Sequence, residues 1–338
     1  MSQPAVDPSR RLTPVVRLAP AKLNLSLAVV GRGADGYHQL HSVMVPLRLA
    51  DRLSLAPAAD RADTLHVDGF DAGPNETNLV RRALSATREA IGAGWSGSAG
   101  PPPALAVRLD KRIPVAAGLA GGSSDAAAAL DGALEAWGAS LTIHERLRVA
   151  ARLGSDVPFF LAGGPALVEG RGESVTPLRG VTGPPPGVLV VTPRLAMSTA
   201  DVFAAHDAAG DAAAAGATRT SSSHLADELR NGLTAGALVD RAGVLAVAND
   251  LLAAASLIVP GLVGLRRSLS RRLLRPVGQS GSGPTLWVLY PSLVEAEAAA
   301  EDVRTAFAEG ALVAPGDGPP FVAATEMVGR REPDRSDP

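Results

Sequence analysis

The residues best suited to chemistry lie in one run of small side chains, IPVAAGLAGGSSDAAAAL, from position 113 to position 130. Glycines at 118, 121 and 122 leave backbone N–H groups unobstructed, and Ser123 and Ser124 add hydroxyls where a helix is predicted to begin. Because aligned peptide dipoles give a helix start about half a positive charge, phosphate is the natural ligand there. A glycine-rich turn with a serine N-cap is the alternative.

A lysine for such a phosphate site must come from elsewhere, because a Walker A loop has a lysine beside its Ser or Thr and this run has none. Lys22, in APAKLNLSL, is the candidate, and period-two alternation places it on one strand face with Asn24. It could orient an acceptor hydroxyl and stabilise charge during phosphoryl transfer. An exposed lysine on an edge strand is the alternative.

Asp156, in GSDVPFF, follows a predicted helix end and precedes a proline and two phenylalanines. A carboxylate held beside an apolar wall could act as a base toward a substrate hydroxyl. An N-cap for a short following helix is the other interpretation.

A second glycine-rich loop, Gly278 to Trp287, leads into a predicted strand. It is either an ordinary tight turn or a loop that closes over the same ligand as the run at Gly118.

The segment GRGADG, Gly31 to Gly36, matches the dinucleotide-binding pattern G-x-G-x-x-G. That pattern needs a helix at its last glycine, and the β-like YHQLHSVMVPL follows instead, so we predict a hairpin turn. His38 and His41 are spaced unfavourably for a metal pair on a strand. With Tyr37, they suit stacking and hydrogen bonding to a planar ligand, or are surface strand residues.

Composition limits the classes of function. The 338 residues include 32 Lys and Arg against 34 Asp and Glu, so no basic field is available for nucleic acid or an anionic membrane. The absence of cysteine excludes disulfides and thiolate chemistry and fits the cytoplasm. The N-terminus lacks a signal-peptide core and no long uncharged apolar run occurs, which predicts a soluble protein without a membrane span.

Periodicity predicts a mixed α/β chain that begins with antiparallel strands. Strands are expected at 15–30, 42–55 with a break at Pro46, 104–114, 165–178, 188–193 and 285–290. The first of these should be half-buried. Helices are expected at 78–91, 124–137, 141–154 with a Thr142/Glu145 capping box, 198–206, 224–236, 261–273 and 293–307.

We expect four parts along the chain: a flexible arm (1–14), an N-terminal domain (15–180), a C-terminal domain (181–328) and a flexible tail (329–338). Two stretches, 92–103 and 208–223, are rich in small residues and are predicted to be surface excursions.

Together these segments resemble the GHMP kinases, the family of galactokinase and of homoserine, mevalonate and phosphomevalonate kinases. The resemblance runs from about Val16 to Phe307. It rests on APAKLNLSLAV, DGYHQLHSV, NLVRRA, KRIPVAAGLAGGSSDAAAAL, LGSDVPFFLAGG, GRGE, NDL and GSGPTLWVLY, in the family's order. It implies an α+β fold of two domains: an N-terminal α/β domain with a glycine-rich phosphate loop, and a ferredoxin-like C-terminal domain.

Within that family, AKLNLSL and DGYHQLHSV resemble the branch that acts on diphosphocytidyl-methylerythritol. The resemblance implies transfer of the γ-phosphoryl group of ATP to the 2-hydroxyl of that substrate. Asp156 would then accept the hydroxyl proton, and Lys22 would hold the carboxylate and the hydroxyl in register.

The resemblance also assigns the binding residues. Mg²⁺ would accompany ATP, with Ser124 as a contact to Mg²⁺ or to phosphate. The residues implied to bind ATP are Pro114, Ala116, Ala117, Gly118, Leu119, Ala120, Gly121, Gly122, Ser123, Ser124 and Asp125. The residues implied to bind the other substrate are Asn24, Tyr37, His38, Phe203, Gly281 and Ser282.

Two alternatives stay open: a GHMP kinase for another small alcohol, and a nucleotide sensor on the same scaffold that transfers no phosphate. We expect small-molecule partners only, and a monomer or weak homodimer.

Overall fold

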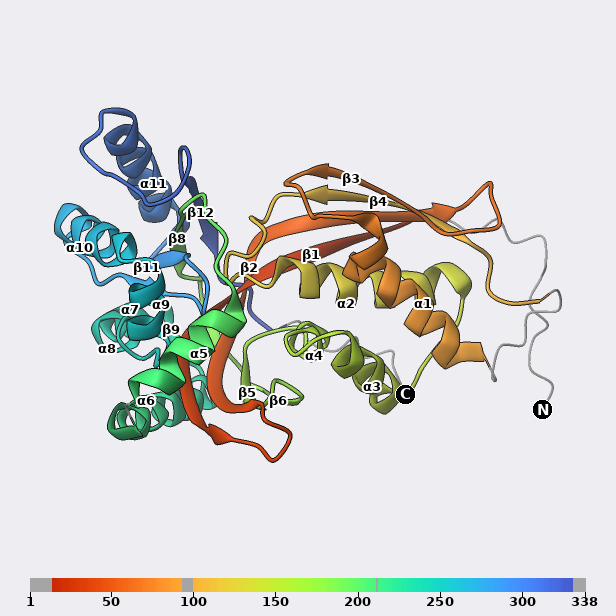
Figure 1. Cartoon of the computed structure of the whole chain (residues 1–338), viewed down its shortest axis with the longest axis horizontal. Coiled ribbons are helices and arrows are strands. Elements are labelled where there is room, and N and C mark those ends of the chain that lie inside the picture. Colours follow the sequence, from red (N-terminus) through yellow and green to blue (C-terminus); the bar gives the residue numbers. More distant parts are fainter. Residues whose placement is uncertain (1–13, 93–99, 211, 331–338) are drawn as a thin grey trace. The chain divides into compact units, whose positions relative to one another are not determined.

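The computed structural model describes residues 14–92, 100–210 and 212–330, and its contacts divide the chain into two compact units (Figure 1). Within the described residues, unit 1 comprises 14–19, 50–92, 100–113 and 121–161. Unit 2 comprises 20–49, 114–120, 162–210 and 212–330. The predicted arm, most of the tail and most of the 92–103 stretch lie outside the described residues.

Two long strands form the N-terminal hairpin, β1 (Val15–Arg32) and β2 (His38–Pro57). The GRGADG segment is its turn, closed by bonds from Gly33 N to Tyr37 O (2.8 Å) and from Gly36 N to Gly33 O (3.0 Å). This confirms the hairpin interpretation over the dinucleotide pattern.

Unit 1 packs helices on a small sheet. Strand β4 pairs in parallel with β3 and antiparallel with the end of β2. Besides parts of the hairpin, unit 1 contains β3 (Thr64–Gly69), η1 (Asn75–Thr77), α1 (Leu79–Ile91), β4 (Leu105–Lys111), α2 (Gly121–Trp137), α3 (Ile143–Leu153) and α4 (Val157–Leu161). The predicted capping box at Thr142 and Glu145 is present at the start of α3.

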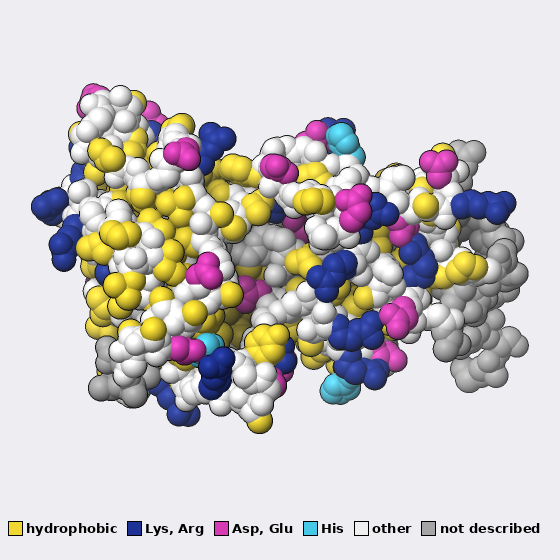
Figure 2. All heavy atoms as spheres, viewed as in Figure 1, with side chains coloured by type: hydrophobic (Ala, Val, Ile, Leu, Met, Phe, Trp, Pro, Cys, Tyr) yellow, Lys and Arg dark blue, Asp and Glu magenta, His cyan; other side chains and the backbone are white. Residues whose placement is uncertain are grey.

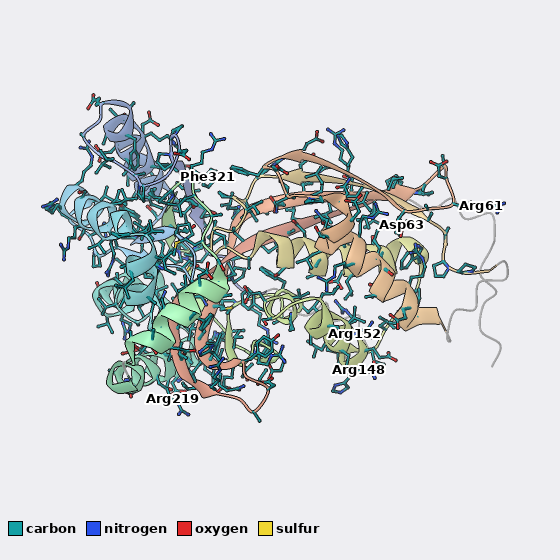
Figure 3. All side chains as sticks on the ribbon, viewed as in Figure 1. Arg61, Asp63, Arg148, Arg152, Arg219 and Phe321 are labelled. Atoms are coloured by element: carbon teal, nitrogen blue, oxygen red, sulfur yellow. The ribbon has the colours of Figure 1, made fainter. Side chains whose placement is uncertain are left out.

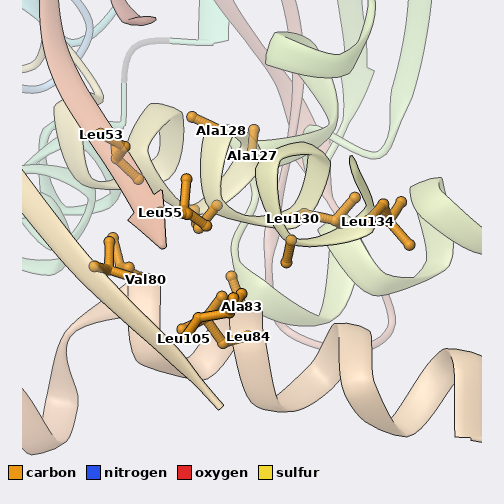
Figure 4. Packing of buried hydrophobic residues seen from close by; sticks show 14 of the residues in the cluster. Leu53, Leu55, Val80, Ala83, Leu84, Leu105, Ala127, Ala128, Leu130 and Leu134 are labelled. Atoms are coloured by element: carbon orange, nitrogen blue, oxygen red, sulfur yellow. The ribbon is translucent and has the colours of Figure 1, made fainter. Parts of the chain in front are cut away.

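Helix α2 is the central element of unit 1. Its alanines and leucines favour helix, and almost every position from Ser124 to Trp137 is buried. Figure 4 shows Leu130 and Leu134 of α2 in the same cluster as Leu55 and Leu84. Gly132 allows the close approach, because a Cβ built there would lie 2.7 Å from Leu55 Cδ1. The middle of α2 is therefore packed closely against β2 and α1.

Unit 2 contains a four-stranded antiparallel sheet in the order β10-β11-β8-β12. Along the chain, β8 (Gly187–Thr192) is followed by helices, then β10 (Gly278–Gln279), β11 (Leu286–Tyr290), α11 (Leu293–Ala308) and β12 (Phe321–Glu326). This is the βαββαβ order of a ferredoxin-like domain, as the family resemblance implied.

The rest of unit 2 surrounds that sheet and the hairpin. Strand β5 pairs with the first residues of β2, and β6 pairs with β5. The remaining elements are β5 (Ala166–Gly170), β6 (Ser174–Pro177), β7 (Val181–Thr182), α5 (Thr199–Ala209), α6 (Ala212–Asn231), β9 (Leu233–Thr234), α7 (Ala235–Asp240), α8 (Ala242–Leu245), α9 (Leu252–Ile258) and α10 (Gly261–Leu273).

Several sequence expectations were wrong. Stretch 208–223 is largely helical rather than an excursion, because α6 begins at Ala212, where alanine favours helix. The first strand is buried on both faces, not one, from Ala21 to Val29. Strand β2 does not break at Pro46, which lies between the residues that pair with β5 and those that pair with β4.

The domain boundary predicted at residue 180 stays a prediction. The two contact units divide the chain differently, because residues 20–49 and 114–120 group with the C-terminal half. Helix α2 begins three residues before the predicted Ser124.

Charges are interspersed on the face shown in Figure 2, as expected from a net charge of −2. Within the described residues, no one helix has the length and apolar composition to cross a membrane, although the bent pair α9 and α10 passes that test together.

Candidate active site

Lys22 is buried inside unit 2, with only 4% of its surface exposed. Its ammonium donates to Asn24 Oδ1 at 2.7 Å and to the carbonyl oxygen of Gly118 at 3.0 Å. A buried ammonium is costly unless it is paired or hydrogen-bonded, so these bonds fix its position. The edge-lysine interpretation is therefore wrong, and the shared strand face of Lys22 and Asn24 is confirmed.

A chain of polar side chains supports Asn24 from behind. Asn24 Nδ2 donates to Ser42 Oγ at 2.8 Å, and Ser42 Oγ donates to the carbonyl of Ser26 at 2.6 Å. The Ser26 hydroxyl bonds Ser222, which also lies 2.9 Å from Nδ1 of His41. With its amide held in this way, Asn24 presents Oδ1 to the lysine.

His41 belongs to this buried support. Burial lowers its pKa, against a smaller opposing effect of Glu169, and Arg219 on α6 (Figure 3) adds to the lowering. His41 therefore stays neutral near pH 7, in contact with serine hydroxyls. The structure gives it a supporting position, not the ligand-stacking one that its spacing allowed.

The second glycine-rich loop lies directly against the first, inside unit 2. A Cβ at Gly118 would lie 2.3 Å from Ser280 O, and one at Gly283 would lie 2.3 Å from Gly118 N. Ser280 Oγ donates to Gly118 O at 2.9 Å and accepts from Asn24 N at 3.3 Å. The two loops are therefore in direct contact, and that both close over one ligand stays a prediction.

Gly281 completes this contact. Its φ is +59°, and a Cβ there would lie 3.0 Å from Asn24 Oδ1 and 3.5 Å from Lys22 Nζ. Asn249 anchors the loop by donating to the carbonyl oxygen of Gly281 at 2.9 Å. Ser282 bonds Thr199 at 3.0 Å, at the start of α5.

The phosphate-loop segment has an unusual backbone. Ala116, Gly118 and Ala120 all have positive φ, of 54°, 81° and 53°. Non-glycine residues rarely adopt such angles, and they persist only where the surroundings enforce them. Residues 114–120 belong to unit 2, and the chain enters unit 1 at Gly121, where α2 begins. The loop is therefore a shaped backbone that ends at a helix start.

The first turn of α2 carries two buried oxygens without partners. Neither Ser124 Oγ nor Asp125 Oδ1 has a hydrogen-bond partner within the described residues. A buried oxygen without a hydrogen bond destabilises the folded state by about 1–3 kcal/mol. A ligand that bonds such an oxygen would remove that cost. Ser124 was singled out from the sequence for this purpose.

Asp125 shares one ammonium with a second carboxylate. Lys111 Nζ donates to Asp125 Oδ2 at 2.8 Å and also pairs with the fully buried Asp51. Desolvation raises the pKa of Asp125 to about 7, opposed by Lys111 and reinforced by Asp51. One lysine thus pairs with two buried carboxylates.

Asp156 is half-buried in unit 1, immediately before the buried Val157, Pro158 and Phe159 of α4. Asp156 therefore directly precedes α4, as both interpretations of its position allowed. Whether Asp156 and Lys22 act on one hydroxyl stays a prediction.

At the turn end of the hairpin, three aromatic rings lie in unit 2. His38 stacks on Phe203 of α5, with ring centroids 4.5 Å apart, and its Nε2 lies 2.7 Å from Asp207 Oδ1. The exposed ring of Tyr37 lies under the guanidinium of Arg171, 3.8 Å from its centroid. His38 and Phe203, far apart in sequence, are thus brought together.

Sequence reasoning missed the residues that hold these groups: Ser42, Asp51, Lys111, Arg171, Asp207, Ser222 and Asn249. Four of them lie in quoted segments, Ser42 in DGYHQLHSV, Lys111 in KRIPVAAGLAGGSSDAAAAL, Arg171 in GRGE and Asn249 in NDL, but no role was predicted for any of them. Among the described residues, no group of three or more His, Cys, Asp or Glu could hold a metal ion by itself.

Comparisons with known proteins give a consistent result. Residues 78–164 match the family described as GHMP kinases N terminal domain. A 4-diphosphocytidyl-2-C-methyl-D-erythritol kinase of Deinococcus radiodurans is 38% identical over 291 residues, 85% of this chain and 89% of that protein. The enzyme of that name from Pelotomaculum thermopropionicum is 44% identical over 191 residues, and the match covers 56% of this chain and 63% of that protein.

A solved structure of 4-(cytidine 5'-diphospho)-2C-methyl-D-erythritol kinase aligns with 93% of this chain and all of its own, at a TM-score of 0.65 and 32% identity. The first two curated relatives are each matched over less than two thirds of their length, 63% and 64%.

Gly118→Ala should lower the free energy of unfolding by about 1–3 kcal/mol, because it strains a positive φ and brings a Cβ into contact with Ser280 O. Gly122→Ala is the matched control: its Cβ would meet nothing closer than Leu79 Cδ1 at 3.7 Å, and alanine favours the helix. Urea denaturation followed by circular dichroism measures both. Equal stability of the two variants would contradict the described loop contact.

Asp125→Asn should change how stability depends on pH. With a folded pKa near 7 and an unfolded value near 4, Asp125 contributes stability that is present at acid pH and lost as pH rises to about 7. The stability of the unmodified chain minus that of Asp125→Asn should therefore fall by roughly 1.4 kcal/mol per pH unit from pH 5 to 7, then level off.

Urea denaturation at half-unit pH steps measures this difference, with Ser124→Ala as a neighbouring change that removes no titrating group. A difference for Asp125→Asn that is flat, or that rises with pH, would mean that the carboxyl is ionised throughout.

Proposed function

The chain belongs to the 4-diphosphocytidyl-2-C-methyl-D-erythritol kinase family, and from that premise we propose that it transfers the γ-phosphoryl group of ATP to the 2-hydroxyl of that cytidyl substrate. The products are the 2-phosphate and ADP, a step in the non-mevalonate route to isoprenoid precursors. The observation that carries the proposal is the buried Lys22 ammonium, bonded to Asn24 and to the backbone of the phosphate loop at Gly118.

ATP is the phosphoryl donor, and residues 114–125 are its phosphate site. The positive-φ backbone at Ala116, Gly118 and Ala120 turns the chain so that it can follow a polyphosphate closely. The start of α2 adds its dipole and the hydroxyls of Ser123 and Ser124. A chain with a net charge of −2 can in this way bind a polyanion with local groups.

Mg²⁺ fits the unpartnered, buried Ser124 Oγ, because Mg²⁺ takes oxygen ligands and usually binds one or two protein side chains together with substrate phosphates. When bound, it would neutralise charge on the β- and γ-phosphoryl oxygens. Ser124 would hold it, and the unpartnered Asp125 Oδ1 offers a second oxygen in the same turn.

Asp156 and Lys22 divide the chemistry on the acceptor. As the 2-hydroxyl oxygen forms its bond to the γ-phosphorus, the bond from that phosphorus to the bridging oxygen breaks, and ADP leaves. The hydroxyl proton passes to the Asp156 carboxylate. Lys22, fixed by Asn24 and Gly118, orients the acceptor hydroxyl and stabilises negative charge on the transferring group.

The hairpin end and α5 hold the cytidyl end of the substrate. Phe203 and Tyr37 offer aromatic faces to a pyrimidine ring, and His38 offers a ring nitrogen to its edge. Asn24, Gly281 and Ser282 lie at the Lys22 end of unit 2, where the erythritol hydroxyls and the diphosphate would bind.

We propose a monomer or weak homodimer that acts in the cytoplasm on small molecules, without membrane or nucleic-acid partners. The near balance of acidic and basic residues supports the last part.

Asp156→Asn should lower kcat by about a thousandfold or more while the ATP dissociation constant changes by less than about threefold, because the carboxylate acts in the chemical step. Lys22→Ala should lower kcat in the same manner. Coupled ADP release and calorimetric ATP titration measure the two quantities, and ³¹P NMR identifies the product as the 2-phosphate.

Asp60→Asn, an exposed aspartate after β2, is the matched control and should leave kcat unchanged. Turnover of Asp156→Asn near that of the control would remove Asp156 from the mechanism. A Lys22→Ala variant that only raises the KM of the cytidyl substrate would make Lys22 a binding residue.

A further inference from the structure

Two side chains of α5 contact the same imidazole. Phe203 and Asp207 are four residues apart, so they share one helix face, and both reach His38 at the start of β2. Phe203 stacks on the ring at 4.5 Å with an interplanar angle of 21°, while Asp207 Oδ1 lies 2.7 Å from Nε2 at the ring edge. The helix therefore holds both the plane and the rotation of the His38 ring.

The Asp207 carboxylate is held from its other side as well. Arg32 Nη1 lies 3.5 Å from Oδ2, and Arg32 is itself positioned by a 2.7 Å bond from its Nε to Gly36 O. The hydrogen bond to His38 is the main cause that lowers the pKa of Asp207, with smaller contributions from Arg32 and His206. Asp207 is therefore ionised at neutral pH and can only accept hydrogen bonds.

An acceptor at Nε2 fixes the tautomer of a neutral imidazole. If Nε2 carries the hydrogen and donates it to Asp207, then Nδ1 has a free lone pair and can only accept. Within the described residues, Nε2 to Asp207 is the one hydrogen bond of the His38 ring. The remaining nitrogen is thus available to a ligand as an acceptor.

Cytosine and uracil differ in the group at position 4, to which an acceptor such as His38 Nδ1 could bond. Position 4 of cytosine carries an amino group, which donates, whereas position 4 of uracil carries a carbonyl, which accepts. We propose that Asp207 is a specificity-determining residue, which sets the His38 tautomer so that Nδ1 accepts from the 4-amino group of cytosine and rejects uracil.

This inference rests on the proposed function, in which His38 and Phe203 meet the pyrimidine. It adds a positioning residue that acts through His38 and gives the reason why cytidine is chosen over uridine. With uracil, the acceptor Nδ1 would face the 4-carbonyl oxygen, which is also an acceptor, and no hydrogen bond could form. Binding sites discriminate strongly against a ligand that leaves a polar group unpaired in this way. We expect CDP to bind at least about tenfold more tightly than UDP.

Asp207→Asn tests the inference, since an amide can present either oxygen or nitrogen to Nε2 and so no longer dictates the tautomer. Isothermal titration of the full-length chain with CDP, UDP and ATP at pH 8 gives three dissociation constants per variant. Asp207→Asn should lower the CDP preference about tenfold, chiefly through weaker CDP binding, and leave ATP affinity unchanged.

Two variants serve as controls. Asp201→Asn makes the same change in the first turn of α5, at an exposed position, and should keep the full CDP preference. Tyr37→Leu should weaken CDP and UDP by similar factors, because stacking is indifferent to the group at position 4 and the Tyr37 ring packs against Arg171 rather than against His38.

An unchanged CDP-to-UDP ratio in Asp207→Asn would overturn the inference, as would equal weakening of CDP, UDP and ATP, which indicates a merely structural role. Equal affinity of the unmodified chain for CDP and UDP would also overturn it, and phosphorylation of the cytidyl substrate by that same chain would leave the proposed function standing. The two proposals can also separate in the other direction. If Asp207→Asn loses the CDP preference as expected, but the unmodified chain releases no ADP with the cytidyl substrate, the inference is supported and the proposed function is contradicted.

Discussion

The candidate site depends on the backbone contact between the turn at Ala117 and Gly118 and the loop from Ser280 to Gly283. Both loops need glycine there, because a Cβ at Gly118 or at Gly283 would overlap the opposite backbone. The contact leaves the Gly118 carbonyl to accept from both Ser280 and Lys22. The position of the lysine is therefore set by two loops more than 150 residues apart (162 between Gly118 and Ser280) and not by its own strand alone.

Further hydrogen bonds within unit 2 hold the residues on either side of this contact. Asn24 bonds the lysine, Ser42 bonds Asn24, and Asn249 holds the carbonyl of Gly281. Each of these side chains is buried and hydrogen-bonded, so the arrangement is pre-organised before any ligand arrives. The opposite condition holds in the first turn of α2, in unit 1, where Ser124 and Asp125 leave buried oxygens unsatisfied. The groups that hold Lys22 are thus paired, whereas these two oxygens at the start of α2 are not.

Sequence reasoning placed Lys22 and Asn24 on one strand face and a helix start after the glycine-rich run, because strand alternation and glycine spacing are local signals, and the family resemblance implied the ferredoxin-like domain. It missed the partners, such as Asp207 for His38 and Lys111 for Asp125, since these contacts depend on tertiary packing. Strand β12 escaped notice because FVAATE has little alternation and is defined by its pairing with β8. Helix α6 was misjudged because small residues were interpreted as a loop, although alanine favours helix. Local patterns were thus easier to predict than the tertiary contacts that hold them in place.

The central claim is that this chain phosphorylates a cytidyl alcohol and not a smaller one. The most direct test is ADP release from Mg·ATP by the purified chain, with 4-diphosphocytidyl-2-C-methyl-D-erythritol, mevalonate and homoserine offered in parallel at equal concentration. Turnover with the cytidyl substrate alone is the predicted result. ADP release with mevalonate or homoserine in preference to it, or ATP binding without release of ADP for any of the three, would contradict the account.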